Sequence, residues 1–294
     1  SSAAISTFLF FLAGFVYLNT PEMAAFGGWW RIPTAVAVGV LLAILIDRLT
    51  EYFTGTHASP VKEIKKAADT GPATLILQGI ASGFESSVWS VLVIAMTIVA
   101  SIFIMGTIPG VVGVERVNFI LYGVAMTGIG MLTLTGNTIS MDVFGPVADN
   151  ANGIGEMGYD KEEMEREKPG SYKRARQILA DLDAVGNTTK AETKGIAIGS
   201  AVIAAVSLFA SFIAVIAVGS EEKINEMTTT QYLAEAGRLT VADPKVFIGF
   251  LLGGAVPFLF SSMLIRAVGR AAFYIVNECR VQFRDAAIWA GTKK

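Results

Sequence analysis

Long apolar runs separated by short polar segments dominate the hydrophobic pattern of this chain. A transmembrane helix needs about 20 mostly apolar residues. The second run reaches that length only if aromatic residues lie at both membrane interfaces, as in aromatic belts. The pattern predicts an all-α fold, a polytopic transmembrane helical bundle that forms a single domain over 1–294. Its six spans are expected at approximately 3–18, 29–53, 73–105, 118–150, 180–218 and 244–285.

The basic residues predict the orientation of these spans, because cytoplasmic loops carry an excess of Lys and Arg. Five of the 23 basic residues fall in one set of loops, namely Arg31, Arg116, Lys223, Arg238 and Lys245. All the others fall in the alternate set, which includes the run from Lys161 to Lys194. We therefore expect that second set, together with the N-terminal end of the chain, to be cytoplasmic.

Composition narrows the class of protein. The chain is 53% hydrophobic and 16% charged, with a net charge of −2, so no basic field indicates a nucleic-acid partner. One cysteine, Cys279, and one histidine, His57, exclude an intrachain disulfide and metal sites built from Cys or His. Because the sequence opens inside an apolar run without Met, we expect an internal fragment of a longer polypeptide.

Small residues recur where helices of such a bundle would touch. Gly195 and Gly199, and Gly249 and Gly253, form small-xxx-small pairs, and three glycines thin the fourth span. This spacing lets helix backbones approach closely. The pattern is common in helical bundles and predicts packing more than function.

The string SMDVFGPVADNANGIGEM carries Asp142, Asp149 and Glu156 at intervals of seven residues. Seven residues turn a helix by about 700°, so the three carboxylates fall close to one face. Gly145-Pro146 should loosen or kink this helix, since proline removes a backbone hydrogen bond. Such a stripe faces a polar cavity or the bundle interior if it lies in the membrane. A cytoplasmic helix end with solvated acids is equally compatible with the spacing.

A second stripe lies in ADLDAVGNTTKAETKGIAIGSA, where Asp183, Asn187, Lys190 and Lys194 follow each other at intervals of four, three and four. Opposite a row of carboxylates, these groups suit a polyanion bound with a hard cation. Mg²⁺ prefers carboxylate and phosphate oxygens, and lysine binds phosphate as a point charge. The alternative is an amphipathic interfacial helix with snorkelling lysines. The charged segment 158–176 between the stripes is interpreted as a solvated linker.

The strings GPVADNANGIGEM and LDAVGNTTKAETKGIAIGSA resemble motifs of the membrane-bound, ion-pumping inorganic pyrophosphatases. The flanking strings TEYFTGT, TGPAT, AVGRAA and VQFRD are also similar to that family, so the resemblance covers most of the chain. It places this stretch at the central six of the family's sixteen transmembrane helices. The implied activity is hydrolysis of Mg-pyrophosphate to two phosphates, coupled to proton pumping.

The resemblance also implies roles for individual residues. Asp149 matches a ligand of substrate Mg²⁺, and Asp183 matches a polar pocket residue that could share the metal. Asn187 and Lys194 match substrate-binding residues, and Lys190 with Thr193 matches the potassium-independent, proton-pumping subclass, in which a lysine ammonium replaces a bound cation. Asp142 and Glu156 are expected to support the site.

Three features depart from the family pattern. Asn152 stands where the family usually has glycine, Glu192 adds an acid beside the pocket helix, and the loop before Asp183 is longer than usual. The family's DNVGD-type acidic string does not occur here, so the water-activating aspartates and the ion gate are expected outside this chain. The fragment alone is therefore predicted to be inactive, with no certain catalytic residue of its own.

The resemblance further implies an integral membrane protein with a cytoplasmic catalytic side, in a prokaryotic inner or plasma membrane. The expected partners are pyrophosphate, the lipid bilayer, the rest of its own polypeptide and a second copy in a homodimer. Two alternatives remain: a secondary transporter or permease, since broken helices with polar residues also mark transporter sites, and a structural remnant of a degraded gene.

Overall fold

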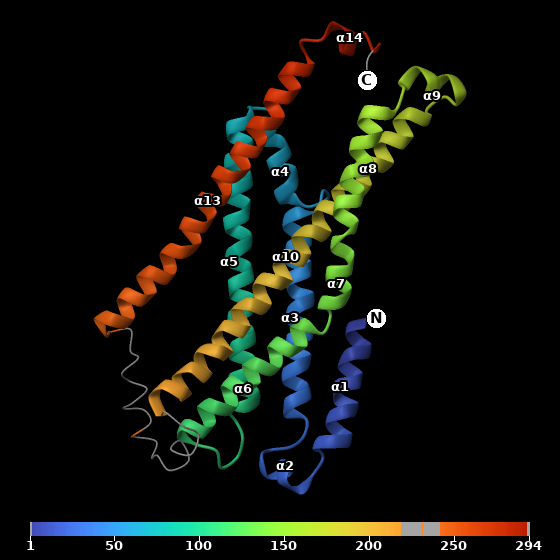
Figure 1. Cartoon of the computed structure of the whole chain (residues 1–294). Helices are drawn as coiled ribbons and strands as arrows, with labels where there is room; N and C mark the ends of the chain where they lie inside the picture. Colours follow the sequence, from blue (N-terminus) through green and yellow to red (C-terminus); the bar gives the residue numbers. More distant parts are fainter. Residues whose placement is uncertain (1, 219–230, 232–241, 293–294) are drawn as a thin grey trace. The chain divides into compact units, whose positions relative to one another are not determined.

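A computed structural model describes residues 2–218, 231 and 242–292, and every regular element among them is helical (Figure 1). The helices are α1 (Ser2–Leu18), α2 (Pro21–Ala25), α3 (Arg31–Thr54), α4 (Ser59–Ala68), α5 (Pro72–Met105), α6 (Gly113–Leu132), α7 (Thr135–Asp142), α8 (Phe144–Gly158), α9 (Lys161–Glu167), α10 (Ser171–Val218), α13 (Pro244–Gln282) and α14 (Ala286–Trp289).

The lengths and hydropathy of these helices confirm the all-α membrane-bundle class. Among the described residues, four segments are long and apolar enough to cross a membrane. They are the combined segment α3–α4, and the single helices α5, α10 and α13. The pair formed by α6 and α7–α8 makes a fifth if it is one bent span. At 17 residues, α1 is shorter than these candidate spans, so the predicted number of six spans is not confirmed. The basic residues Lys223 and Arg238, used for the orientation, lie outside the described residues.

The described helices fall into two units, one up to Ile216 and the other from Ala217 onward. In the first unit α3 is central and packs against α1, α5 and α6. Its main core joins α3, α5, α6 and α10 and consists of Leu42, Ala43, Ile46, Val93, Ile94, Val124, Met131, Ile196 and Ile203. The second unit contains α13 and α14, and no residue of α13 is buried.

Glycines mark the closest helix crossings in the first unit. A Cβ atom on Gly39 of α3 would overlap the carbonyl oxygen of Thr127 on α6, and one on Gly130 would overlap that of Val36. A Cβ atom on Gly199 of α10 would lie 2.8 Å from Ile46 Cδ1. These positions confirm that small residues allow close backbone approach here. In α13, by contrast, no described residue of the same unit lies within 4 Å of a Cβ atom placed on Gly249 or Gly253.

The segment from α6 to α8 is broken at two places. A bend of 43° lies between α6 and α7, at residues 133–134. The second break is the single residue Val143 between α7 and α8. Pro146 follows it by three residues and has no N–H to donate to the carbonyl of Asp142. The Gly-Pro dipeptide thus accompanies a local interruption of the helix at Val143, while the 43° bend lies at residues 133–134.

Arg31 at the start of α3 ties this helix to the end of α5. Its Nε donates to the carbonyl of Gly27 at 3.2 Å, and its guanidinium also donates to the carbonyl of Ile104 and to both oxygens of Thr107. The guanidinium carbon lies 4.9 Å from the ring centre of Trp30. The last carbonyls of a helix lack intrahelical partners. This side chain provides a donor for the Ile104 carbonyl in the last turn of α5 and for the loop carbonyls of Gly27 and Thr107.

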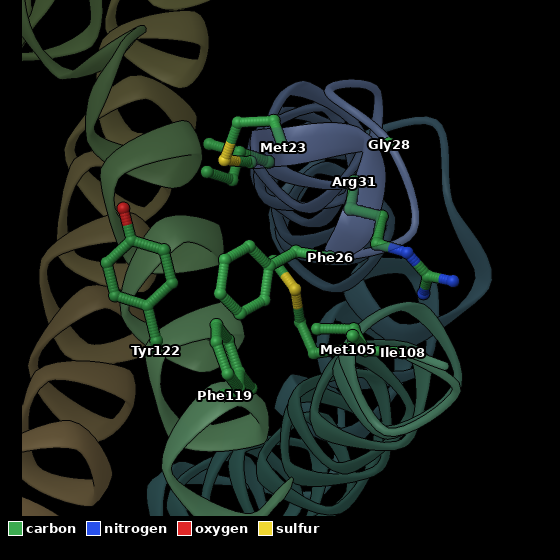
Figure 2. Close-up of a pocket in the computed structure, with 9 residues that line it drawn as sticks. Met23, Phe26, Gly28, Arg31, Met105, Ile108, Phe119 and Tyr122 are labelled. Atoms are coloured by element: carbon green, nitrogen blue, oxygen red, sulfur yellow. The ribbon is translucent and has the colours of Figure 1, made fainter. Parts of the chain in front are cut away.

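An apolar cavity of about 160 Å³ lies beside Arg31. Figure 2 shows the rings of Phe26, Phe119 and Tyr122 together with Met105 around this space, while the Arg31 guanidinium points away from it. Its remaining lining residues are Met23, Gly28, Ile32 and Ile108. The cavity lies between α2, α3, α5 and α6, at the end of α3 opposite to its acidic end with Asp47 and Glu51.

Candidate functional site

The two helices that carry the predicted stripes, α8 and α10, lie side by side and antiparallel (Figure 1). They touch through glycines, since a Cβ atom on Gly186 would lie 2.9 Å from the Cα atom of Gly145 and 3.3 Å from Ala148 Cβ. A Cβ atom on Gly145 would collide with the side chain of Lys190. This close crossing brings polar side chains of the two helices within reach of hydrogen bonds and ion pairs over successive turns.

The first contact of this set joins the predicted metal ligand to the predicted cation surrogate. Lys190 Nζ lies 3.6 Å from Asp149 Oδ2 and donates to Asn187 Oδ1 at 3.5 Å. The Lys190 side chain is 24% exposed and that of Asp149 is 65% exposed. The ammonium is therefore held within the helix pair, while the carboxylate remains open to a ligand.

Asp183 is held from both helices. Its Oδ1 accepts from Asn187 Nδ2 at 3.4 Å, one turn along α10. Its Oδ2 accepts from Asn152 Nδ2 on α8 at 3.3 Å. The structure thus brings Asp183, Asn187 and Lys190 into one connected set, as the spacing predicted, and adds Asn152.

An ion pair joins α8 and α10 near the end of α8 and the beginning of α10. Arg176 Nη2 donates to Glu156 Oε1 at 2.7 Å. Arg176 Nη1 donates to the backbone oxygen of Asn152 at 3.2 Å and to its Oδ1 at 3.1 Å. Next to this set a cavity of about 650 Å³ is lined by Lys161, Glu165, Gly170, Tyr172, Lys173, Arg176, Gln177 and Ala180.

The other predicted residues are not part of this network. Thr193 Oγ1 is shared between the carbonyl oxygens of Thr138 on α7, at 3.3 Å, and Thr189, at 3.0 Å. Lys194 is exposed, and within the described part of the chain its side chain has no hydrogen bond or ion pair. The side chain of Asp142, which is half-buried at the end of α7, also has no hydrogen bond or ion pair within the described residues. Thr193 therefore packs α10 against α7, whereas Lys194 is available to a ligand.

Glu192 faces α3 rather than α8. It lines a cavity of about 270 Å³ with Ile44, Asp47, Arg48 and Glu51, all on α3. Asp47 Oδ1 is buried, and among the described residues it has no hydrogen-bond partner. The extra acid noted in the sequence thus lies on the opposite side of α10 from the stripe and does not contact the predicted ligands.

The fit of these residues to Mg²⁺ depends on their donor atoms. Carboxylate oxygens of Asp149 and Asp183 lie on facing helices beside the amide oxygen of Asn187, and oxygen donors of this kind suit Mg²⁺. Within the described residues no three acids, His or Cys gather as a metal cluster. Mg²⁺ commonly uses only one or two protein carboxylates and completes its shell with water and phosphate oxygens. The residues present therefore fit a substrate-borne ion better than a dedicated metal cage.

Two participants, Asn152 and Arg176, were not among the predicted site residues. Asn152 was noted only as a departure from a motif, and Arg176 was assigned to the charged linker. A signal was nevertheless present in the sequence. Arg176 precedes Asp183 by seven residues, and Asn152 follows Asp149 by three, so both extend the stripes at helical spacing.

Fold and site define a class: a polytopic helical membrane protein with acids, amides and lysines between the extended ends of two helices. The family model described as "Inorganic H+ pyrophosphatase" matches residues 1–294. The chain therefore belongs to the inorganic H⁺ pyrophosphatase family.

Curated relatives agree with this assignment. A "K(+)-insensitive pyrophosphate-energized proton pump" of Chloroflexus aurantiacus is 55% identical over 89% of this chain and 32% of its own length. One of the same name from Streptomyces coelicolor is 41% identical over 97% of the chain and 35% of its length. A "Putative K(+)-stimulated pyrophosphate-energized sodium pump" of Clostridium tetani is 36% identical over 85% of the chain and 32% of its length. The chain thus spans about a third of the length of these relatives.

Proposed function

We propose that the full-length protein hydrolyses inorganic pyrophosphate, bound as its magnesium complex, to two phosphates and couples this reaction to proton pumping. This chain supplies part of the substrate site. The observation that carries the proposal is the polar contact set between α8 and α10, in a chain matched throughout by the pyrophosphatase family model. Polyanion binding by paired carboxylates and lysines is the chemistry that this set suits.

The acidic residues are proposed to bind the metal ion, and the amide and lysine residues are proposed to bind the substrate. Asp149 and, on the facing helix, Asp183 would hold Mg²⁺, and the ion when bound would neutralise phosphate oxygens and stabilise the leaving phosphate. Asn187 and the exposed Lys194 would bind the substrate. The attacking water would be activated by aspartates outside this chain, so residues 1–294 alone are expected not to turn over Mg-pyrophosphate.

Lys190 is proposed to make the protein potassium-independent. Its ammonium lies between the oxygens of Asp149 and Asn187, where a monovalent cation would find the same two ligands. The relatives support this assignment, since the K⁺-insensitive proton pump of Chloroflexus is 55% identical to this chain and the putative sodium pump of Clostridium is 36% identical. H⁺ is therefore the proposed coupling ion, with Thr193 beside Lys190 on α10.

The length of α10 supports a cytoplasmic position for the site. At 1.5 Å per residue, its 48 residues measure about 72 Å, more than twice the roughly 30 Å hydrocarbon core. The site residues lie in the first half of α10, directly after the charged hairpin around α9. A secondary transporter would instead place its polar groups near the membrane midplane. The family pattern further suggests a homodimer in a prokaryotic plasma membrane.

Phosphate release by the purified full-length protein tests the proposal. We expect hydrolysis of pyrophosphate that requires Mg²⁺ and proceeds without K⁺. The isolated chain of residues 1–294 serves as the control and should release no phosphate. A full-length protein that is folded in the membrane and releases no phosphate from pyrophosphate would contradict the proposal.

A further inference from the structure

Arg176 presents its guanidinium to two groups of α8 at once. Nη2 donates to Glu156 Oε1 at 2.7 Å, and Nη1 donates to the backbone and side-chain oxygens of Asn152 at 3.2 and 3.1 Å. The Arg176 side chain is 21% exposed. A planar guanidinium fixed by several acceptors holds them in a defined geometry. The position of Asn152 is therefore set from α10.

The contact with Arg176 determines which way the Asn152 amide faces. Because arginine has only donors, the oxygen of the Asn152 amide must face the guanidinium, and its NH₂ group then faces away. That NH₂ group donates to Asp183 Oδ2 at 3.3 Å. Arg176 thus acts on Asp183 through a single intervening amide.

The other oxygen of Asp183 is held in the same manner. Asn187 Nδ2 donates to Asp183 Oδ1 at 3.4 Å, while Asn187 Oδ1 accepts from Lys190 Nζ at 3.5 Å. Each carboxylate oxygen therefore receives one amide donor, and each amide is oriented by one cation. Two donors on two oxygens fix the rotation of the carboxylate and leave other lone pairs free to accept from a ligand.

We propose that Asn152 and Arg176 are positioning residues for Asp183 and set the affinity of the site for Mg-pyrophosphate without touching the substrate. The proposal rests on the proposed function, because it assumes that Asp183 faces the bound substrate. It assigns a role to the residue that departs from the family's glycine and to an arginine of the charged segment before the site. Neither residue is needed for the chemical step, so substrate affinity should respond more than the maximal rate.

The test compares the unaltered full-length protein with Asn152→Ala, Arg176→Met and the double variant. Arg174→Met is the matched control, because Arg174 lies two residues away on α10, is exposed, and has no side-chain hydrogen bond or ion pair within the described residues. Two quantities are measured: KM and kcat for Mg-pyrophosphate, and the concentration of Mg-imidodiphosphate that produces half of the maximal thermal stabilisation. The second readout reports binding without hydrolysis.

We expect both single variants to raise KM and the half-stabilising concentration by about tenfold, which corresponds to about 1.4 kcal/mol, with kcat changed far less. The double variant should resemble the single variants, since both break the same connection. The control should match the unaltered protein.

Four outcomes would overturn the proposal. Unchanged KM and binding in Asn152→Ala would exclude positioning through the amide. Independent effects that multiply in the double variant, or a loss of kcat and thermal stability with KM unchanged, would indicate helix packing instead. If the unaltered protein neither hydrolyses pyrophosphate nor is stabilised by Mg-imidodiphosphate, the proposed function fails and the positioning role with it.

Discussion

Lys190 Nζ on α10 lies 3.6 Å from Asp149 Oδ2 on α8. The pair joins the two motifs that the sequence separates by 41 positions, and the same ammonium donates to Asn187. A positive charge is thus built into the helix crossing at a point where two oxygen ligands converge. We therefore expect the enzyme's requirement for K⁺ to depend on this lysine.

Replacing Lys190 by alanine should convert the full-length protein into a potassium-requiring enzyme. Without the ammonium, two oxygen ligands remain in a space that K⁺ can fill. We expect activity in K⁺-free buffer to fall by about tenfold or more, the effect of roughly 1.4 kcal/mol in the barrier, and to recover when K⁺ is added. Hydrolysis is measured in matched choline and potassium salts. Equal loss of activity in both salts would remove support from the cation-surrogate role.

Lys194→Ala should weaken substrate binding. Lys194 is exposed and has no partner within the described residues, so its charge is available to a phosphate oxygen. The loss of one charge-assisted hydrogen bond, about 1.5–3 kcal/mol, corresponds to a rise in KM of roughly tenfold to a hundredfold. Lys62→Ala on α4 is the control, since Lys62 is also exposed but lies outside the site. If both variants show unchanged kinetics, Lys194 does not bind the substrate.

The crossing of α8 and α10 should be sensitive to a single methyl group. In Gly186→Ala the new Cβ atom would lie 2.9 Å from the Cα atom of Gly145, so the helices must separate. Overpacking of this kind costs about 1–3 kcal/mol, and both thermal stability and activity should decrease. Gly136→Ala on α7 is the control, because no atom of the described residues outside its own helix turn lies within 4 Å of its new Cβ atom. A Gly186→Ala protein as stable and active as the control would show that the helices do not cross closely here.

The helix stripes could be predicted from the sequence because they depend only on helical periodicity. Asp183, Asn187 and Lys190 share one face of α10 for that reason, and their hydrogen bonds follow. The partner helix and its register could not be predicted, since they depend on where Gly145 and Gly186 allow two backbones to touch. For this reason Asn152 was interpreted only as a departure from a motif.

The charge pattern misled the interpretation of one residue and left the partner of another open. Arg176 lies in a run of mixed charges and was interpreted as part of a solvated linker, although its side chain reaches back to α8. Glu192 follows Lys190 by two residues, so it points to another side of α10 and meets α3. The 43° bend at residues 133–134 has no proline or Gly-Pro signal at the break.

Arg31→Met should destabilise the first unit where the start of α3 meets the end of α5. The variant keeps most of the apolar stem but leaves the carbonyls of Gly27, Ile104 and Thr107 without this donor. These hydrogen bonds are partly buried, so each should contribute less than the roughly 1–3 kcal/mol of a fully buried group left unsatisfied. The thermal midpoint in detergent should therefore fall by a few degrees at most per bond lost. Arg31→Lys should fall by a smaller amount, because an ammonium can serve some of these acceptors. An unchanged midpoint in Arg31→Met would show that water or another segment satisfies these carbonyls.

The most direct test of the central claim is proton uptake by vesicles that contain the full-length protein. Pyrophosphate and Mg²⁺ are added outside in potassium-free buffer, and internal pH is followed with a fluorescent dye. We predict acidification that requires pyrophosphate, is collapsed by an uncoupler, and is lost or requires far more substrate in Lys194→Ala. Pyrophosphate hydrolysis without any acidification would contradict the pumping function, and the absence of both would contradict the account as a whole.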